Sequence, residues 1–217
     1  MRFQIITLFP EVVGPYLGAS MLWKAAEKEI ASYEVINLRE FGLGPRRQVD
    51  DMPYGGGDGM LLRCEPIFAA VEQAKESAPD ARVILPTPRG KLWTQQLAKE
   101  FSGRHEDADY IIICPHYEGY DERILELVDH QISLGNYILT GGELPALIIV
   151  DSIVRLLPGV LGGENSAEDE SFSCGTNLEY PQYTRPEEFR GQKVPPVLLS
   201  GHHGEIAKWR QDHSGQI

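Results

Sequence analysis

Short apolar runs alternate with amphipathic stretches through the first 160 residues of the chain. Runs rich in Ile, Val and Tyr predict strands at 2–8, 33–38, 82–86, 110–114 and 137–139. Helical spacing predicts helices at 20–30, 66–76, 95–101 and 122–128. Because strands that alternate with helices usually pair in parallel, we expect an α/β fold with helices on both faces of a parallel sheet.

The clearest helical pattern covers residues 143–157. It begins directly after two glycines, carries Pro145 in its first turn and ends before a Pro-Gly pair. Most of its residues are apolar, which predicts a buried helix. Asp151 and Arg155 are exceptions, and their i,i+4 spacing places them on one face. They form either a local ion pair or a site where the arginine faces a substrate.

The composition changes after residue 161 and divides the chain into three parts. Residues 1–161 form the predicted α/β domain. Residues 162–175 are acidic and lack large aliphatic side chains from 164 to 170, which is typical of a flexible linker. Residues 176–217 predict a small helical domain with one short helix at 205–212. A domain of this size needs the first domain or a partner chain to pack against.

The overall charge argues mildly against a nucleic-acid partner, because the formal net charge is -12 and phosphate contacts require cations. A local basic patch can still hold RNA on an acidic protein. Pairs of cations occur at 46–47, 89–91, 185–190 and 208–210. These pairs are either scattered surface charges or parts of such a patch.

The cysteines and the hydropathy pattern bear on location. The three cysteines lie far apart, which fits neither a disulfide framework nor a CxxC metal site. No apolar run reaches the roughly 18 residues of a membrane span. The N-terminus leads directly into a strand pattern rather than a signal peptide. We therefore expect reduced thiols, no membrane association and a cytoplasmic location.

Several common catalytic and nucleotide-binding motifs are missing, namely GxGxxG, GxxxxGK[ST], HExxH and GxSxG. The Gly-rich segment 54–60 is either a phosphate-binding loop or a flexible turn. More informative are three loops rich in Gly and Pro at 87–90, 115–119 and 140–143, each after a predicted strand. Ligands of α/β sheets bind at the carboxyl ends of strands, so these loops predict a pocket for a small ligand. The alternative is that they are only tight crossovers.

Six sequence blocks carry a resemblance to a known family. They are YGGGDGM, HYEGYDER, ISLGNYILTGGELPA, RLLPGVLG, YPQYTRPEEF and VPPVLLSGHHGEIAKWR. In this order they resemble the signature blocks of the bacterial tRNA (guanine-37-N1) methyltransferases, the TrmD family, and the likeness runs from Leu8 to about Arg210. The resemblance implies a SPOUT fold whose parallel sheet carries a deep trefoil knot, followed by a small helical domain that binds tRNA. It also implies a homodimer with active sites at the subunit interface.

The family resemblance implies that the knot binds S-adenosylmethionine. Carried over residue by residue, the expected cofactor-binding residues are Thr87, Pro88, Pro115, Tyr117, Glu118, Gly119, Leu134, Gly135, Asn136, Tyr137, Ile138, Leu139, Gly141, Gly142 and Pro145. Two of them depart from the family pattern. Pro115 stands where the family generally has Gly and removes a backbone donor, and Asn136 replaces the usual Asp and removes a charge.

The same resemblance implies methyl transfer to N1 of the guanine at tRNA position 37. N1 must lose its proton to become a nucleophile, so a carboxylate is needed as general base. The family position is Glu170 here, where relatives usually have Asp, and Asp169 is the alternative. The family arginine corresponds to Arg155, whose charge would stabilise the developing negative charge on O6. Some members need Mg²⁺, for which Glu118 and the linker carboxylates are the candidate ligands.

Two other functions remain open at this point. The chain is either a methyltransferase for another RNA, or a homologue that binds cofactor or RNA with weak or no turnover because of the changes at Glu170 and Pro115. Relatives usually continue for some tens of residues beyond the last residue of this sequence. We therefore expect a shortened tRNA-binding domain with a lower affinity for tRNA.

Overall fold

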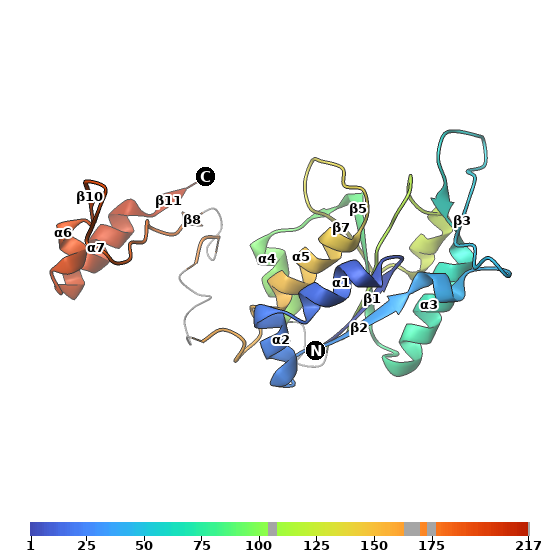
Figure 1. Cartoon of the computed structure of the whole chain (residues 1–217), viewed down its shortest axis with the longest axis horizontal. Coiled ribbons are helices and arrows are strands. Elements are labelled where there is room, and N and C mark those ends of the chain that lie inside the picture. The colour runs from blue at the N-terminus through green and yellow to red at the C-terminus, as the bar shows by residue number, and fades with distance from the viewer. Residues whose placement is uncertain (104–107, 163–169, 173–176, 217) are drawn as a thin grey trace. The chain divides into compact units, whose positions relative to one another are not determined.

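The computed structural model describes residues 1–103, 108–162, 170–172 and 177–216. It divides the chain into two units, Met1–Gly162 and Gly163–Ile217 (Figure 1). The predicted linker at 162–175 falls largely outside the described residues.

A parallel sheet of five strands forms the centre of the first unit. The strands are β1 (Arg2–Thr7), β2 (Ser32–Asn37), β5 (Arg82–Leu92), β6 (Tyr110–Ile113) and β7 (His130–Ser133). Their order is β2-β1-β6-β5-β7, and every neighbouring pair is parallel. The predicted α/β fold with a parallel sheet is confirmed.

Helices cover both faces of this sheet. Successive residues of a strand point to opposite faces, so neighbouring residues of β1 pack against different helices. In β1, Ile5 packs with α1 (Pro10–Leu17), α2 (Ser20–Glu27), α4 (Gln95–Gly103) and α5 (Glu143–Val154). Its neighbour Ile6 packs with α3 (Cys64–Ser77) and with the 3-10 helices η1 (Leu38–Phe41) and η2 (Glu122–Leu127). Both clusters consist of fully or nearly fully buried apolar side chains. The sheet is therefore rigid where its strands end.

The elements differ from the sequence prediction in four places. The strand predicted at 82–86 continues as β5 to Leu92, so the predicted loop at 87–90 is an irregular stretch within this strand. The strand predicted at 137–139 is wrong: the fifth strand is β7, and Tyr137 and Ile138 are 54% and 79% exposed. The helix predicted at 122–128 is a short 3-10 helix. The sequence pattern missed α1, which contains Pro15, because burial of Val13 and Leu17 outweighs the unfavourable proline.

A short antiparallel pair projects from the first unit, formed by β3 (Asp50–Asp51) and β4 (Leu61–Leu62). The Gly-rich segment joins these two strands. β4 is tied to the loop after β6, because the N–H of Leu62 donates to the carbonyl of Gly119 at 2.9 Å. This hydrogen bond fixes the end of the Gly-rich hairpin beside that loop.

The second unit is made of short elements. They are β8 (Asn177–Leu178), β9 (Glu188–Phe189), β10 (Gln192–Lys193), α6 (Pro196–Leu199), α7 (His203–His213) and β11 (Gly215–Gln216). The helix predicted at 205–212 is present as α7. Ring contacts support it: Trp209 stacks on His213 at 4.1 Å between ring centroids, and Arg210 lies over Tyr180 at 4.8 Å.

Within the described part of the chain, no helix has the length and apolar character needed to cross a membrane.

Candidate functional site

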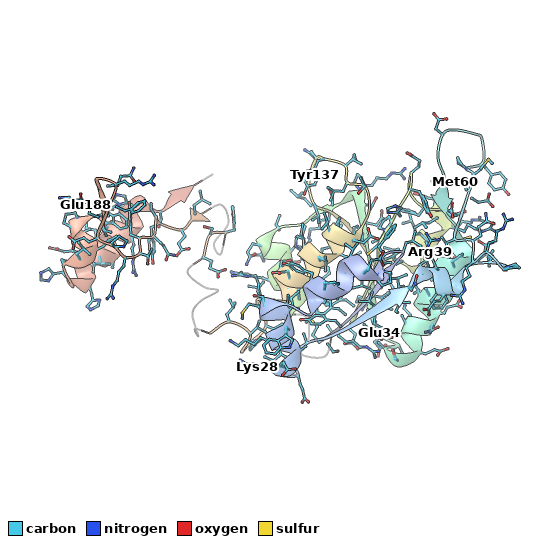
Figure 2. All side chains as sticks on the ribbon, in the orientation of Figure 1. Lys28, Glu34, Arg39, Met60, Tyr137 and Glu188 are labelled. Carbon is cyan, nitrogen blue, oxygen red and sulfur yellow. The ribbon has the colours of Figure 1, made fainter. Side chains whose placement is uncertain are left out.

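A cavity of about 600 Å³ lies at the carboxyl ends of β5, β6 and β7. This is the edge at which parallel α/β sheets bind their ligands, and the volume suits a small organic molecule. Its walls come from residues 86–89, where the pairing of β5 with β7 is irregular, and from the loops that follow β6 and β7. Figure 2 marks Tyr137 on the loop after β7.

All the predicted cofactor-binding residues line this cavity except Asn136, which is exposed outside it. The lining also contains residues that the sequence reasoning did not single out as cofactor-binding. These are Leu61, Pro86, Arg89, His116, Tyr120, Glu122, Ile132, Ser133 and Thr140. Most of them are immediate neighbours of predicted residues in the same three loops, so their sequence position was an available signal. Sequence position gave no such signal for Leu61, because this residue belongs to β4 and not to one of the predicted loops.

Glycines let the three loops approach one another at backbone distance. A Cβ added to Gly142 would overlap the Cδ of Pro115 and lie 2.7 Å from the Cα of Cys114. The N–H of Gly142 donates to the carbonyl of Pro115 at 2.7 Å. A Cβ on Gly90 would overlap the backbone of Ile132. Larger residues at 90 and 142 would push the loops apart and open the cavity.

A buried polar contact fixes the start of α5 under the cavity. The hydroxyl of Thr7, at the end of β1, donates to Oε1 of Glu143 at 2.8 Å, and Glu143 is 7% exposed. Burial, and secondarily the charge of Glu143, raises the pKa of the Cys114 thiol well above its usual value. Cys114 therefore stays a neutral thiol that packs in the core.

His116 forms part of the cavity wall beside this contact. Its ring lies 4.9 Å from that of Phe9, and its buried Nδ1 has no hydrogen-bond partner among the described residues. A Cβ on Gly141 would lie 2.8 Å from this Nδ1. The absence of a side chain at Gly141 therefore keeps the space beside the imidazole open.

Two contacts join the loops across the rim of the cavity. The hydroxyl of Tyr120 donates to that of Thr87 at 3.2 Å. The guanidinium of Arg89 forms an ion pair with Glu122 at 3.0 Å. The ion pair is solvent-exposed on both sides and contributes little energy, so the rim can rearrange around a ligand.

Glu118 links the cavity to the Gly-rich segment. Its N–H donates to the carbonyl of Met60 at 3.1 Å, and its side chain packs against Gly59. Gly59 has a φ of +83°, a conformation that a residue with a side chain rarely adopts. The tip of the segment is open to solvent, and Tyr54 is fully exposed.

The predicted catalytic residues do not line the cavity. Arg155 follows the last residue of α5, whereas Pro145 in its first turn contacts the cavity. At a rise of 1.5 Å per residue, the ten steps from Pro145 to Arg155 span about 15 Å. Glu170 is described and partly exposed, and Asp169 lies outside the described residues. The cavity and these catalytic candidates therefore do not form one compact site within the described part of a single chain.

The possible ion pair between Asp151 and Arg155 was one of two predictions for α5. The structure shows Tyr16 as a partner of Asp151, since the tyrosine hydroxyl donates to Oδ2 at 2.7 Å. This hydrogen bond is the largest of the causes that raise the pKa of Tyr16.

Among the described residues, no three His, Cys, Asp or Glu side chains come together as a metal site. The linker carboxylates considered for Mg²⁺ at 163–169 lie outside these residues. Mg²⁺ binding by Glu118 and the linker carboxylates therefore stays a prediction.

Comparison with known proteins identifies the family. The family described as tRNA (Guanine-1)-methyltransferase TrmD matches residues 1–216. The chain belongs to this family. A TrmD-family tRNA (guanine-N(1)-)-methyltransferase of Geobacillus kaustophilus is 54% identical over 215 residues, covering 99% of this chain and 86% of the relative. One from Brevibacillus brevis is 53% identical over 216 residues, with the same coverage.

A solved structure supports the same conclusion. The crystal structure of tRNA (m1G37) methyltransferase from Aquifex aeolicus matches with a TM-score of 0.82 and 41% identity, covering 98% of this chain and 88% of that one. The predicted TrmD membership and methyltransferase activity are confirmed. The alternatives of a homologue without turnover and of an enzyme for another RNA are not favoured.

Proposed function

We propose that this TrmD-family enzyme transfers a methyl group from S-adenosylmethionine to N1 of the guanine at position 37 of tRNA. The observation that carries the proposal is the 600 Å³ cavity at the carboxyl edge of the sheet, lined by residues of the family's own sequence blocks. The similar Aquifex aeolicus protein is a tRNA (m1G37) methyltransferase, so its modified position is the same. A tRNA substrate is also the basis for proposing a cytoplasmic location.

The cavity suits S-adenosylmethionine in size and in lining. Its volume falls in the usual range for ligand pockets, and apolar side chains such as Leu134, Ile138 and Pro145 can cover an adenine ring. Gly141 leaves the space beside His116 and Glu143 open, and Gly142 lets the loop after β7 pack directly against Pro115. Pro115 has no N–H to offer, and its carbonyl already accepts from Gly142. When bound, S-adenosylmethionine supplies an electrophilic methyl group on its sulfonium.

We also propose that the segments 87–90, 115–119 and 140–143 form the trefoil knot of the SPOUT class. Support comes from the close approach of these segments, which are far apart in sequence. Gly90 in β5 packs against the backbone of its strand neighbour Ile132 in β7, and Gly142 after β7 packs against Pro115 after β6. Bound in such a knot, the ligand would contact backbone from all three segments at once.

Arg155 and Glu170 would supply the remaining chemistry. Glu170, or Asp169 in its place, accepts the proton of guanine N1, and the electron pair left on N1 attacks the methyl carbon. The guanidinium of Arg155 stabilises the negative charge that spreads to O6 as the proton leaves. The target base must leave its stack, because N1 lies on its Watson–Crick edge.

The distance between Arg155 and the cavity supports a homodimer with shared active sites. A methyl donor in the cavity would lie about 15 Å from the Arg155 of the same chain. The helices α1 and α5 also carry exposed apolar side chains, with Val12, Leu144 and Ile148 exposed by 47%, 57% and 46%. Contact between two such faces would bury this surface and bring Arg155 to the cavity of the partner subunit.

The second unit would bind the tRNA, as a small helical domain after the linker. Its described residues combine cations with aromatic rings, as in the pairs Arg210–Tyr180 and Arg190–Phe189. Cations contact phosphates and aromatic rings stack on unpaired bases, so this surface fits RNA despite the negative net charge.

The proposed reaction is tested by incubating the protein with S-adenosylmethionine and an anticodon stem-loop RNA. Methyl incorporation is measured with guanine at position 37 and with adenine in its place. We expect incorporation only with guanine, and m1G as the product in a nucleoside digest. Incorporation into both RNAs, or into neither, would refute the proposal.

Mixed dimers test the shared active site. Arg155→Ala removes the cation, and Gly141→Ala obstructs the cavity beside Glu143 and His116. We expect each variant alone to retain only a small residual activity, measurable in single-turnover reactions. Mixing them after reversible dissociation should restore about a quarter of wild-type activity, because half of the dimers then have one intact site of two. No restoration would show that Arg155 serves the cavity of its own chain.

The general base is assigned by comparing Glu170→Gln with Asp169→Asn. The variant that lacks the base should lose about 10²–10⁴-fold in kcat, while the other loses much less. Equal losses would leave neither carboxylate assigned.

A further inference from the structure

Asp151 and Arg155 lie one turn apart on the same side of α5. Side chains at i and i+4 of a helix are neighbours, with about 5–6 Å between their Cβ atoms. Asp151 is half-buried, and its Oδ2 accepts a hydrogen bond from Tyr16 of α1 at 2.7 Å. Its carboxylate is therefore held in place by a residue from another helix.

The negative charge of Asp151 also acts on Tyr33. Burial, and secondarily the charge of Asp151, raises the pKa of Tyr33 to about 12. The hydroxyl of Tyr33 itself donates to the carbonyl of Leu22 at 3.2 Å, so it does not bond to Asp151.

The C-terminal half of α5 is also fixed from its other side. The indole N–H of Trp93 donates to the hydroxyl of Ser152 at 2.9 Å. Trp93 is itself packed edge-on against Phe101, which is 1% exposed. The turn that carries Asp151 and Ser152 is therefore restrained immediately before Arg155.

We propose that Asp151, oriented by Tyr16, is a positioning residue for the guanidinium of Arg155. The inference rests on the proposed function, in which Arg155 contacts guanine O6. A long arginine side chain has many rotamers, and a fixed anion one turn away favours those that lie along this side of α5. Asp151 contacts neither substrate, so its contribution to catalysis is to hold Arg155 in the geometry that the transition state requires.

Two substitutions separate charge from shape. Asp151→Asn keeps the size of the side chain and an acceptor for Tyr16 but removes the charge. We expect kcat to fall about tenfold to a hundredfold, with both KM values changed by less than about twofold. Asp151→Glu keeps the charge and should recover most of the lost kcat. A side chain with a purely structural role would behave in the opposite way, with the isosteric Asn active and the larger Glu impaired.

A double-mutant cycle tests whether Asp151 acts through Arg155. In single-turnover reactions, Asp151→Asn should cost less than about twofold when Arg155→Ala is already present. An equal loss in both backgrounds, or full activity of Asp151→Asn, would overturn the proposal. Tyr16→Phe should give a smaller loss of about threefold in wild type and none in the Arg155→Ala background.

Controls separate the test of the role of Asp151 from the test of the proposed function. Glu27→Gln removes an exposed carboxylate of α2 and should leave kcat unchanged. Calorimetry with S-adenosylmethionine and size-exclusion chromatography should give wild-type values for Asp151→Asn. If wild type does not methylate guanine 37, the proposed function itself is wrong. If wild type methylates it and Arg155→Ala is fully active, only the roles of Arg155 and Asp151 are wrong.

Discussion

The two units of the chain are stabilised in different ways. The first unit packs apolar side chains on both faces of a sheet, and many of them are fully buried. In the second unit no described residue is buried, and its contacts are between partly exposed rings and cations. The proposed cofactor cavity therefore belongs to a preorganised scaffold with a buried core, whereas the proposed RNA-binding surface lies on a unit without described buried side chains.

The largest contrast should come from deleting one aromatic ring in each unit. Phe101 packs against Trp93 and Tyr110 and is 1% exposed. Phe101→Ala should lower the free energy of unfolding of the first unit by about 3–5 kcal/mol, because it leaves a cavity in the core. Trp209→Ala should leave that unfolding unchanged and instead weaken RNA binding about tenfold through lost stacking.

Chemical denaturation and RNA titration measure these two effects. Leu92→Ala is the control, because Leu92 is 54% exposed and its truncation should change stability by less than about 0.5 kcal/mol. If Trp209→Ala destabilised the first unit as strongly as Phe101→Ala does, the contrast between the units would be wrong.

The next largest effect is expected on the affinity of the cavity for S-adenosylmethionine. Gly142→Ala places a methyl group against Pro115 and Cys114, so it should lower the affinity for S-adenosylmethionine about a hundredfold. Calorimetry should show this loss while RNA binding is retained. The matched control is Gly103→Ala at the end of α4, where an added Cβ meets nothing within 4 Å. Wild-type affinity in Gly142→Ala would show that the loops are not held as tightly as the structure implies.

The smallest effect is a pH dependence in the first unit. The folded pKa of Tyr33 is raised to about 12 from an ordinary value near 10. Its contribution to stability is complete below pH 10 and is lost as the pH rises towards 12, because the unfolded state releases its proton first. The loss should amount to about 1–2 kcal/mol after allowance for partial exposure.

Unfolding curves between pH 8 and 12 would measure this loss as the difference between wild type and Tyr33→Phe. The variant should show a shallower decline above pH 10. Parallel curves for the two proteins would contradict the assignment to Tyr33.

The sequence alone determined the alternation of strands and helices, the three loops of the cavity and the TrmD family. These properties are local, since hydrophobic periodicity, turn residues and motif blocks can each be recognised within a short stretch of sequence. It also located most of the cavity lining, because neighbouring residues of one loop share its wall. Asn136 shows the limit of this reasoning: it lies in the correct loop, but it is exposed and outside the cavity lining.

Only the tertiary structure decided which segments meet. The exposed residues at 137–139 resemble a strand in sequence, but the edge position is occupied by β7, whose pairing with β5 depends on the whole sheet. The helix α1 forms despite Pro15 because its buried face packs on the core. The contacts of Gly142 with Pro115 and of Leu62 with Gly119 depend on where the chain returns after long excursions. Such contacts have no signature in local sequence, because their free energy comes from burial between distant residues.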